Sequence, residues 1–256
     1  MRYLSLYQEG NSLLHKIDPI TKLLFVIIAI LVPIIINTLT MALAFFIIST
    51  LLVFVARAFK RTLPIISFSS LVIITVLFIQ GLFYLKNQTP FFTLGPFVFY
   101  KEGLLYATGI AIRIFNIINA VAVLIFTTKP SDLIEALVKK GVSPKIGYVF
   151  SSVLQIIPQM MSIVDTILDA QKARGLETEG SFTKRAKAFI PLIGPAVLNS
   201  LISTKERAMA LEVRGFNSKK KKTFLNEVPY NKYSNVLQVA LIAILVFSII
   251  WRIISW

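Results

Sequence analysis

The residues of this chain best suited to a chemical role are two arginines, each followed by a glycine. Arg174 and Gly175 end the run DAQKARG, and Arg214 and Gly215 end the run MALEVRG. A cation followed by glycine is typical of the last turn of a helix, because glycine adopts the left-handed conformation that terminates helices. A guanidinium stays charged and can bind a carboxylate through two parallel hydrogen bonds. The chemistry predicted for these residues is binding to another protein.

Both predicted helix ends are also slim. Alanine lies four residues before each arginine, at Ala170 and Ala210, and a small apolar residue lies directly before it, at Ala173 and Val213. A single arginine-glycine end would be ordinary helix-terminating chemistry. Two copies forty residues apart predict two similar grooves on partner proteins.

Catalytic and metal-binding patterns are missing from the sequence. It has no cysteine and one histidine, His15, so neither thiol chemistry nor a histidine cluster is expected. It has no phosphate-binding glycine loop, no nucleophile with a plausible base, and no pair of carboxylates inside an apolar segment. We therefore predict that the chain is not an enzyme and itself holds no metal or cofactor.

The composition is that of a membrane protein. Hydrophobic residues make up 56% of the chain and charged residues only 15%, while the formal net charge is +15. The basic residues lie between and beside apolar segments and do not form a detached tail, which argues against nucleic acid as a partner. Basic loops beside membrane spans usually mark the cytoplasmic face.

Five membrane spans are expected. No charge occurs for 34 residues between Lys22 and Arg57, a length of about 50 Å as one helix, which exceeds the roughly 30 Å hydrocarbon core. The chain must therefore fold back, and residues 37–38 are the predicted break. Arg57 then begins a compact basic loop with Lys60 and Arg61. The other three spans are predicted at residues 63–85, 104–128 and 236–251, which places the N-terminus in the cytoplasm and the C-terminus outside.

Three polar residues interrupt the fourth predicted span. Arg113, Asn116 and Asn119 follow one another at three-residue spacing, on similar faces of a helix. A cation inside a span costs at least a few kcal/mol unless it faces protein or water. Arg113 must therefore have a partner. The Arg113 side chain is satisfied either within the helix bundle, which we favour, or at an interface with another protein.

The chain divides into a membrane domain of four spans at residues 1–128, a cytoplasmic domain at 129–232 and a final span at 233–256. The cytoplasmic domain holds 17 of the 27 basic residues and 9 of the 12 acidic ones. Its two long helices form an approximate repeat, in which each has an apolar first half and ends in arginine-glycine. We expect the apolar segments 146–164 and 188–204 to lie at the membrane surface without crossing it, since crossing would oppose the positive-inside bias.

The two motifs, Ala173-Arg174-Gly175 and Val213-Arg214-Gly215, resemble those of the transmembrane T component (EcfT) of energy-coupling factor (ECF) transporters, which are ABC-type transporters. The resemblance covers essentially the whole chain, from Asp18-Pro19 through Thr127 to Pro130 and on to the second motif. It implies an all-α membrane protein with about five transmembrane helices plus a cytoplasmic and interfacial domain of long coupling helices. The location implied is a prokaryotic cell membrane, crossed several times.

The resemblance also implies the partners. They would be two ABC ATPases, which bind the ATP, and a small membrane substrate-binding subunit for a vitamin or other micronutrient, or alternatively for cobalt or nickel. The residues expected to contact the ATPases are Ala173, Arg174, Gly175, Val213, Arg214 and Gly215. An ion-coupled secondary transporter and a membrane scaffold that binds anionic lipid remain as alternatives.

The apolar first halves of the two long helices are expected to contact the substrate-binding subunit. Bends are predicted near Pro158 in one helix and near Pro191 and Pro195 in the other, because proline removes a backbone donor. The apolar positions expected at this surface are Val153, Ile157, Met160, Met161, Leu192 and Leu198.

Overall fold

A computed structural model describes residues 12–175, 182–218 and 232–254 of the chain. The described residues form two compact units, and each is treated by itself below. The membrane unit comprises residues 12–137 and 232–254, and the paired-helix unit comprises residues 138–175 and 182–218. The division falls in the last turn of helix α5 (Pro130–Lys139).

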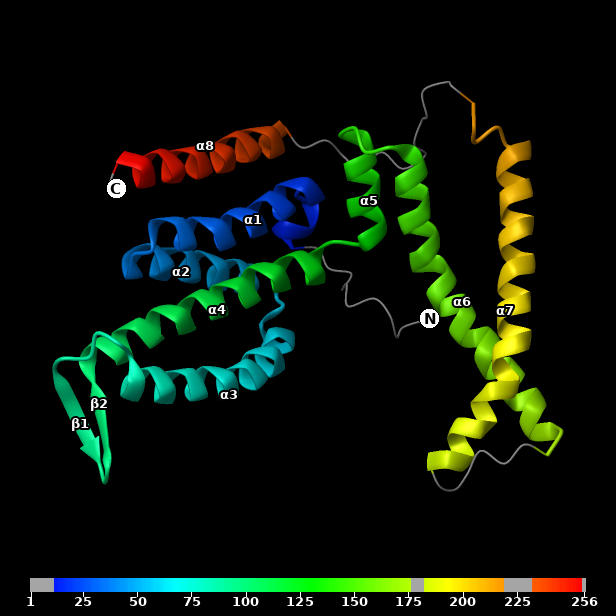
Figure 1. Ribbon diagram of the computed structural model, residues 1–256. Helices are drawn as coiled ribbons and strands as arrows, with labels where there is room; N and C mark the ends of the chain where they lie inside the picture. The colour runs from blue at the N-terminus through cyan, green and yellow to red at the C-terminus, as the bar shows by residue number, and fades with distance from the viewer. Residues whose placement is uncertain (1–11, 176–181, 219–231, 255–256) are drawn as a thin grey trace. The chain divides into compact units, whose positions relative to one another are not determined.

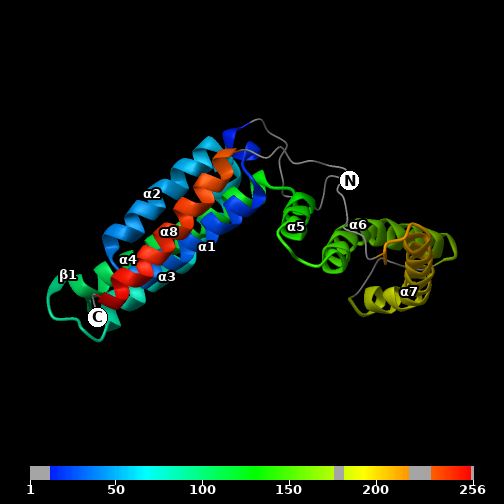
Figure 2. The same ribbon diagram turned by 90° about the horizontal axis from the view of Figure 1, so that it is seen from above.

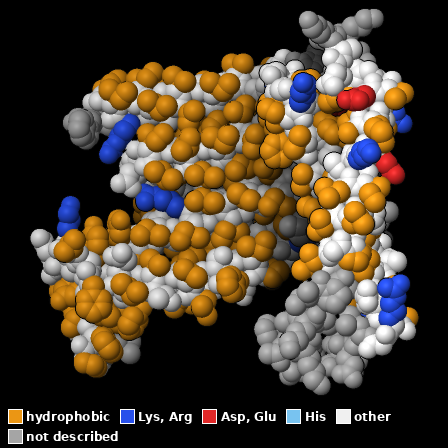
Figure 3. Space-filling model, turned by 45° about the vertical axis from the view of Figure 1, so that its right-hand side comes forward, with side chains coloured by type: hydrophobic (Ala, Val, Ile, Leu, Met, Phe, Trp, Pro, Cys, Tyr) orange, Lys and Arg blue, Asp and Glu red, His pale blue; other side chains and the backbone are white. Residues whose placement is uncertain are grey.

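The membrane unit is a bundle of five long helices. After a short 3-10 turn, η1 (Leu13–Lys16), the helices are α1 (Pro19–Ile36), α2 (Leu39–Val55), α3 (Phe59–Phe83), α4 (Lys101–Thr127) and α8 (Lys232–Ile254). Helix α4 packs against α1, α2 and α3, and α8 packs along α1, as both ribbon views show (Figures 1 and 2). Figure 3 shows long rows of apolar side chains over the helices. The chain is thus an all-α membrane protein, as predicted.

The break between α1 and α2 lies where the sequence predicts it. Asn37 adopts a left-handed conformation with φ 54°, and α2 begins two residues later. Asparagine tolerates this conformation better than most residues, so it ends α1 without a glycine. The long uncharged stretch therefore becomes a helical hairpin of 18-residue and 17-residue helices.

Helix α4 is central because small residues let its neighbours approach its backbone closely. Its buried residues include Gly103, Ala107, Gly109, Ala111, Ala120 and Ala122. The adjoining core contains Val53, Val123 and Phe126. Dispersion contacts between closely packed helices stabilise a bundle in lipid, where hydrophobic burial contributes little.

A β-hairpin joins α3 to α4 where the sequence suggests only a loop rich in turn formers and phenylalanine. Strands β1 (Pro90–Leu94) and β2 (Phe97–Tyr100) pair antiparallel, and Phe92 stacks on Phe99 with ring centroids 4.6 Å apart. Gly95 makes the turn with φ 61°. The hairpin was not predicted, because alternating aromatic residues over so few positions are a weak strand signal.

Among the described residues, five helices are long and apolar enough to cross a membrane: α1, α3, α4, α8 and α6 (Pro144–Ala173). Helix α2 is one residue shorter than α1 and counts as a shorter apolar helix. Five is also the number of spans expected from the sequence, but the two sets differ by one helix. The five long apolar helices include α6, which is predicted not to cross, and leave out α2, which is predicted to cross. Whether residues 146–164 stay out of the bilayer therefore remains a prediction.

The paired-helix unit consists of α6 and α7 (Phe182–Val213), which run antiparallel. Near the start of α6, Tyr148 contacts Phe216, which lies just beyond the end of α7, with ring centroids 5.2 Å apart. Each helix continues through its prolines, among them Pro158 in α6. Figure 1 shows that neither helix is straight.

Candidate functional site

The first arginine-glycine motif ends α6 in the predicted way. Gly175 has φ 92°, a conformation that strains any residue with a Cβ, and its N–H donates to the Lys172 carbonyl at 2.9 Å. Arg174 is the capping residue, so its side chain leaves the chain at the last turn of the helix.

The second motif ends α7 in the same way. Gly215 has φ 69°, and its N–H donates to the Glu212 carbonyl at 2.9 Å. The N–H of Phe216 donates to the Leu211 carbonyl at 3.0 Å, which completes the pair of bonds of a Schellman helix end. The repeat seen in the sequence is therefore a repeat in backbone geometry, since both glycines have positive φ and donate to the carbonyl three residues earlier.

Both tips are open to solvent. All six residues expected to contact ATPases are exposed, and Val213 is 89% exposed. Within the part of the chain that the structure describes, neither arginine side chain forms an ion pair or a hydrogen bond. Both guanidinium groups can therefore bind a partner without first breaking a contact in this chain.

The two tips lie at opposite ends of the helix pair. Because α6 and α7 are antiparallel, the end of α7 lies beside the start of α6, while the end of α6 lies far along the pair (Figure 1). The helix pair therefore carries two similar exposed helix ends at separate positions.

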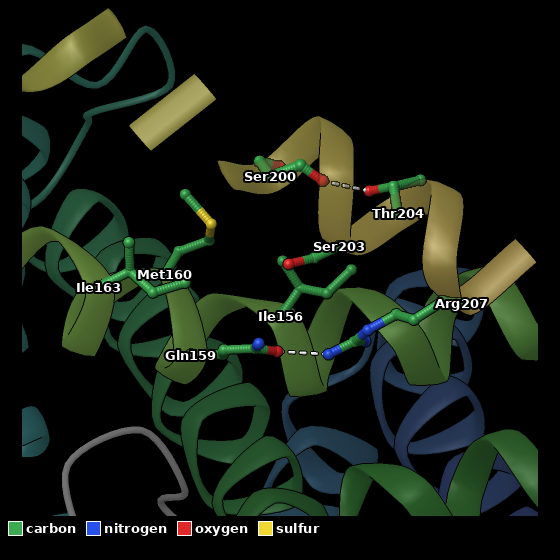
Figure 4. A pocket seen from close by; sticks show the side chains of 8 residues that line it. All are labelled: Ile156, Gln159, Met160, Ile163, Ser200, Ser203, Thr204 and Arg207. Atoms are coloured by element: carbon green, nitrogen blue, oxygen red, sulfur yellow. Dashed lines mark hydrogen bonds between the residues drawn. The ribbon is translucent and has the colours of Figure 1, made fainter. Parts of the chain in front are cut away.

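Helices α6 and α7 contact each other at a crossing lined by both polar and apolar side chains (Figure 4). Arg207 of α7 donates from Nη2 to Oε1 of Gln159 in α6. The other side chains that line this crossing are Ile156, Met160 and Ile163 from α6 and Ser200, Ser203 and Thr204 from α7. The middle of α6 thus packs on the second half of α7, an arrangement that the repeat alone does not reveal.

The apolar residues expected at a partner surface lie in different settings. Val153, Ile157, Met161 and Leu198 are exposed, with Leu198 at 60%. Met160 is only half-buried but lines the crossing with α7, so part of its surface is used within the chain. The side chain of Leu192 lies outside the described residues.

The intramembrane polar residues of α4 bind the α1–α2 hairpin. Arg113 donates from Nη2 to Oδ1 of Asn37 at 2.6 Å, so its partner belongs to this chain and lies in the exposed turn between α1 and α2. Asn119 donates from Nδ2 to Oγ1 of Thr50 in α2 at 2.9 Å. Asn116 donates from Nδ2 to the carbonyl of Ala29 in α1 at 2.6 Å. All three residues thus attach α4 to the α1–α2 hairpin.

A buried polar cluster at one end of the membrane unit escaped the sequence analysis. Lys22 is 5% exposed and donates from Nζ to the Thr127 carbonyl at 3.0 Å and to Oγ1 of Thr128 at 3.2 Å. A lysine at the C-terminus of α4 meets the negative end of that helix. The sequence signal for this contact is a single lysine next to an apolar run, which does not specify a partner 105 residues away.

The same cluster joins the first and last helices. Gln238 of α8 donates from Nε2 to Oδ2 of Asp18 and to Oγ1 of Thr21, both at 3.0 Å. Thr21 also shares a 2.7 Å hydrogen bond with Ser234. The last helix, more than 200 residues away in sequence, is thereby attached to the start of α1.

Comparisons with known proteins match most of this chain. A family model described as "Cobalt transport protein" (CbiQ) matches residues 10–224. The chain belongs to this family. Curated relatives named "Energy-coupling factor transporter transmembrane protein EcfT" come from Brevibacillus brevis, 32% identical over 96% of both chains, and from Lactococcus lactis, 29% identical over 97% of both. A third, from Streptococcus equi, is 32% identical over 82% of this chain and 81% of its own.

As a CbiQ/EcfT family member, the chain is a multi-pass transmembrane component of an ECF transporter and is not an enzyme. Its buried cluster, its α4 polar residues and both arginine motifs lie within the matched residues, apart from the α8 partners Ser234 and Gln238. The family match therefore includes the paired-helix unit and the membrane unit without α8.

Proposed function

We propose that this chain is the energy-coupling scaffold of an ECF-type ABC importer. It transmits ATP hydrolysis in two ABC ATPase subunits to a membrane substrate-binding subunit, which takes up a vitamin or other micronutrient. The observation that carries this proposal is the pair of exposed arginine-glycine helix ends, built alike and lying at opposite ends of α6 and α7. We assign the ATP to the partner ATPases, because the sequence of this chain has no phosphate-binding glycine loop.

The helix pair supports a mechanism based on relative movement. Each ATPase holds one tip through a charge-assisted contact with Arg174 or Arg214. When ATP binding and hydrolysis move the ATPases relative to each other, the two tips move with them, and the crossing at Gln159 and Arg207 transmits the change along both helices. Val213 replaces the alanine of the first copy, so the two contacts are similar but not identical.

The distribution of charge supports a cytoplasmic N-terminus and an external C-terminus. The five bundle helices alternate in direction, so the start of α1, the turn between α2 and α3, and the end of α4 share one end of the bundle. That end carries Lys22, Arg57, Lys60, Arg61 and Lys129. Such a concentration of basic residues supports a cytoplasmic location for this end.

The ATPase contacts are tested by replacing Arg174 and Arg214 with alanine, singly and together, in cells that express the whole transporter. Removing a charged anchor from a groove costs about 2 to 5 kcal/mol, which is roughly 30-fold to several thousand-fold in affinity. Recovery of ATPase subunits and ATP-driven uptake should fall with each single variant and be lost in the double variant.

The matched controls are Lys172→Ala and Lys205→Ala, which remove an exposed cation from the same two helices. They should leave assembly and uptake near the original level. Full assembly and uptake in the double arginine variant would refute the proposed coupling site.

The substrate-binding subunit is proposed to bind the exposed apolar side chains of the helix pair. Aspartate at Met161 or Leu198 should weaken its capture in mild detergent while the ATPases are retained, because a charge there must be desolvated in the interface. Asn199→Asp places the same charge beside Leu198 and serves as the control. Loss of the ATPases with retention of the substrate-binding subunit would reverse the assignment of the two surfaces.

A metal cargo is the second candidate, because the matching family model is described by cobalt transport. Within the described residues no three histidine, cysteine, aspartate or glutamate side chains gather at one place. We therefore assign the choice of cargo to the substrate-binding subunit. Uptake of radiolabelled cobalt and nickel, compared with uptake of labelled vitamins by cells with and without this chain, distinguishes the two cargoes.

A further inference from the structure

A groove lies on the membrane unit between the start of α3 and the second half of α4. It encloses about 720 Å³, a volume within the range of small-molecule sites. Its walls are apolar, and the main contributors are Ile65, Ile117, Ile118, Val121, Ile125 and Phe126. Neither the arginine tips nor the crossing of α6 and α7 takes part in it.

Two cations line the same groove. Lys60 and Arg61 are exposed residues in the first turn of α3, and neither forms an ion pair or side-chain hydrogen bond within the described part of the chain. No acidic residue occurs between Asp18 and Glu102 in the sequence. The N-terminus of α3 adds its positive dipole, and its capping residue, Ala58, offers no side-chain acceptor. The mouth of an apolar groove is thus strongly positive.

The length of the groove decides which apolar occupant suits it. Its α4 wall runs from Ile117 to Phe126, which is about 14 Å at 1.5 Å per residue. That is about half of the roughly 30 Å hydrocarbon core, the depth of one leaflet. A transmembrane helix of a partner would need a groove along the whole core, whereas one acyl chain needs a single leaflet.

We propose that this groove binds an anionic phospholipid. The lipid phosphate pairs with Lys60 and Arg61, and one acyl chain lies along Ile118 and Ile125 between α3 and α4. Basic pockets between transmembrane helices at a membrane surface are suited to anionic headgroups. The proposal depends on neither the ATPase contacts nor the cargo, so its test is independent of the function proposed above.

The test uses the full chain, purified in mild detergent, stripped of lipid and titrated with phosphatidylglycerol or phosphatidylcholine while bound lipid is counted by native mass spectrometry. The original chain should bind phosphatidylglycerol more tightly. The variant K60Q/R61Q should lose about 25-fold in phosphatidylglycerol affinity, at about a factor of five per cation. Glycerol phosphate, which has the headgroup charge but no acyl chain, should not compete.

The control variant is K86Q/K101Q, which removes two exposed cations at the other ends of the same two helices and should bind phosphatidylglycerol like the original chain. A second variant, Ile65→Trp, fills the groove at a half-exposed position and keeps both cations; it should also weaken binding.

Three results would overturn the proposal. They are equal affinity for the two lipids, phosphatidylglycerol binding that K60Q/R61Q leaves unchanged, and a photo-crosslinker on Ile65→Cys that captures a membrane protein and no lipid in cell membranes. The last result would assign the groove to a partner helix. The chain has no cysteine of its own, so the crosslinker reacts at this position alone.

Discussion

Asn116 donates a 2.6 Å hydrogen bond to the carbonyl of Ala29, the carbonyl that Pro33 leaves without its helical partner. In an unbroken helix the N–H of residue 33 would bond to this oxygen, but proline has no N–H. Both Asn116 and Ala29 are buried, with exposures of 1% and 0%. A polar residue that looks costly inside a span therefore satisfies a backbone group in a neighbouring span, as bilayer-spanning helices require.

The first prediction follows from this pair. Asn116→Leu should lower the stability of the chain by about 1 to 3 kcal/mol, because the Ala29 carbonyl is left buried without a donor. In a Pro33→Ala background, where the helix supplies its own N–H, the same substitution should cost less. Thermal unfolding in detergent of the original chain, both single variants and the double variant measures the difference. Equal losses in the two backgrounds would show that Asn116 acts by packing alone.

The second prediction concerns the attachment of α8. Gln238→Leu keeps the size of the side chain but removes two hydrogen bonds, to Asp18 and Thr21, at a buried site. We expect a loss of about 1 to 3 kcal/mol, measured by thermal unfolding, and faster cleavage near α8 in limited proteolysis. Val239→Ala, at the neighbouring exposed position, should change neither measurement.

The third prediction concerns the close approach of α3 and α4. A Cβ on Gly103 would lie 2.2 Å from the backbone carbonyl oxygen of Gln80, so Gly103→Ala forces the two helices apart. Overpacking of this kind costs about 1 to 3 kcal/mol. Gly194→Ala in α7 is the matched control, since a Cβ there meets nothing within 4 Å and alanine favours a helix. Comparable losses at the two positions would contradict the packing of α3 on α4.

The fourth prediction concerns the direction of the arginines. Gly215→Ala places a Cβ at φ 69°, which costs about 1 to 2 kcal/mol, so the helix end should rearrange and Arg214 should point elsewhere. On the proposed function, ATPase affinity should fall by about 5- to 30-fold. Gly215→Asn should bind nearly as well as the original chain, because asparagine tolerates the left-handed conformation. Pull-down of the ATPases with the tagged chain distinguishes the two variants.

Local patterns in the sequence determined the membrane class, the break at Asn37 and both arginine-glycine helix ends. Each of these features depends on a few neighbouring residues: on the length of an uncharged stretch against the thickness of a bilayer, or on which residues tolerate a left-handed backbone. The resemblance to the T component rested on the same short motifs, and the family match confirmed it.

Tertiary structure decided which residues meet. Lys22 reaches a carbonyl 105 residues away, and Gln238 reaches an aspartate 220 residues away. No local periodicity specifies such pairs, because they depend on how whole helices pack. The antiparallel pairing of α6 with α7 likewise placed Met160 at the crossing and the two arginine tips at opposite ends, although the sequence shows only two similar helices. Side chains at such contacts depend on a neighbour's position, which only the packed fold supplies.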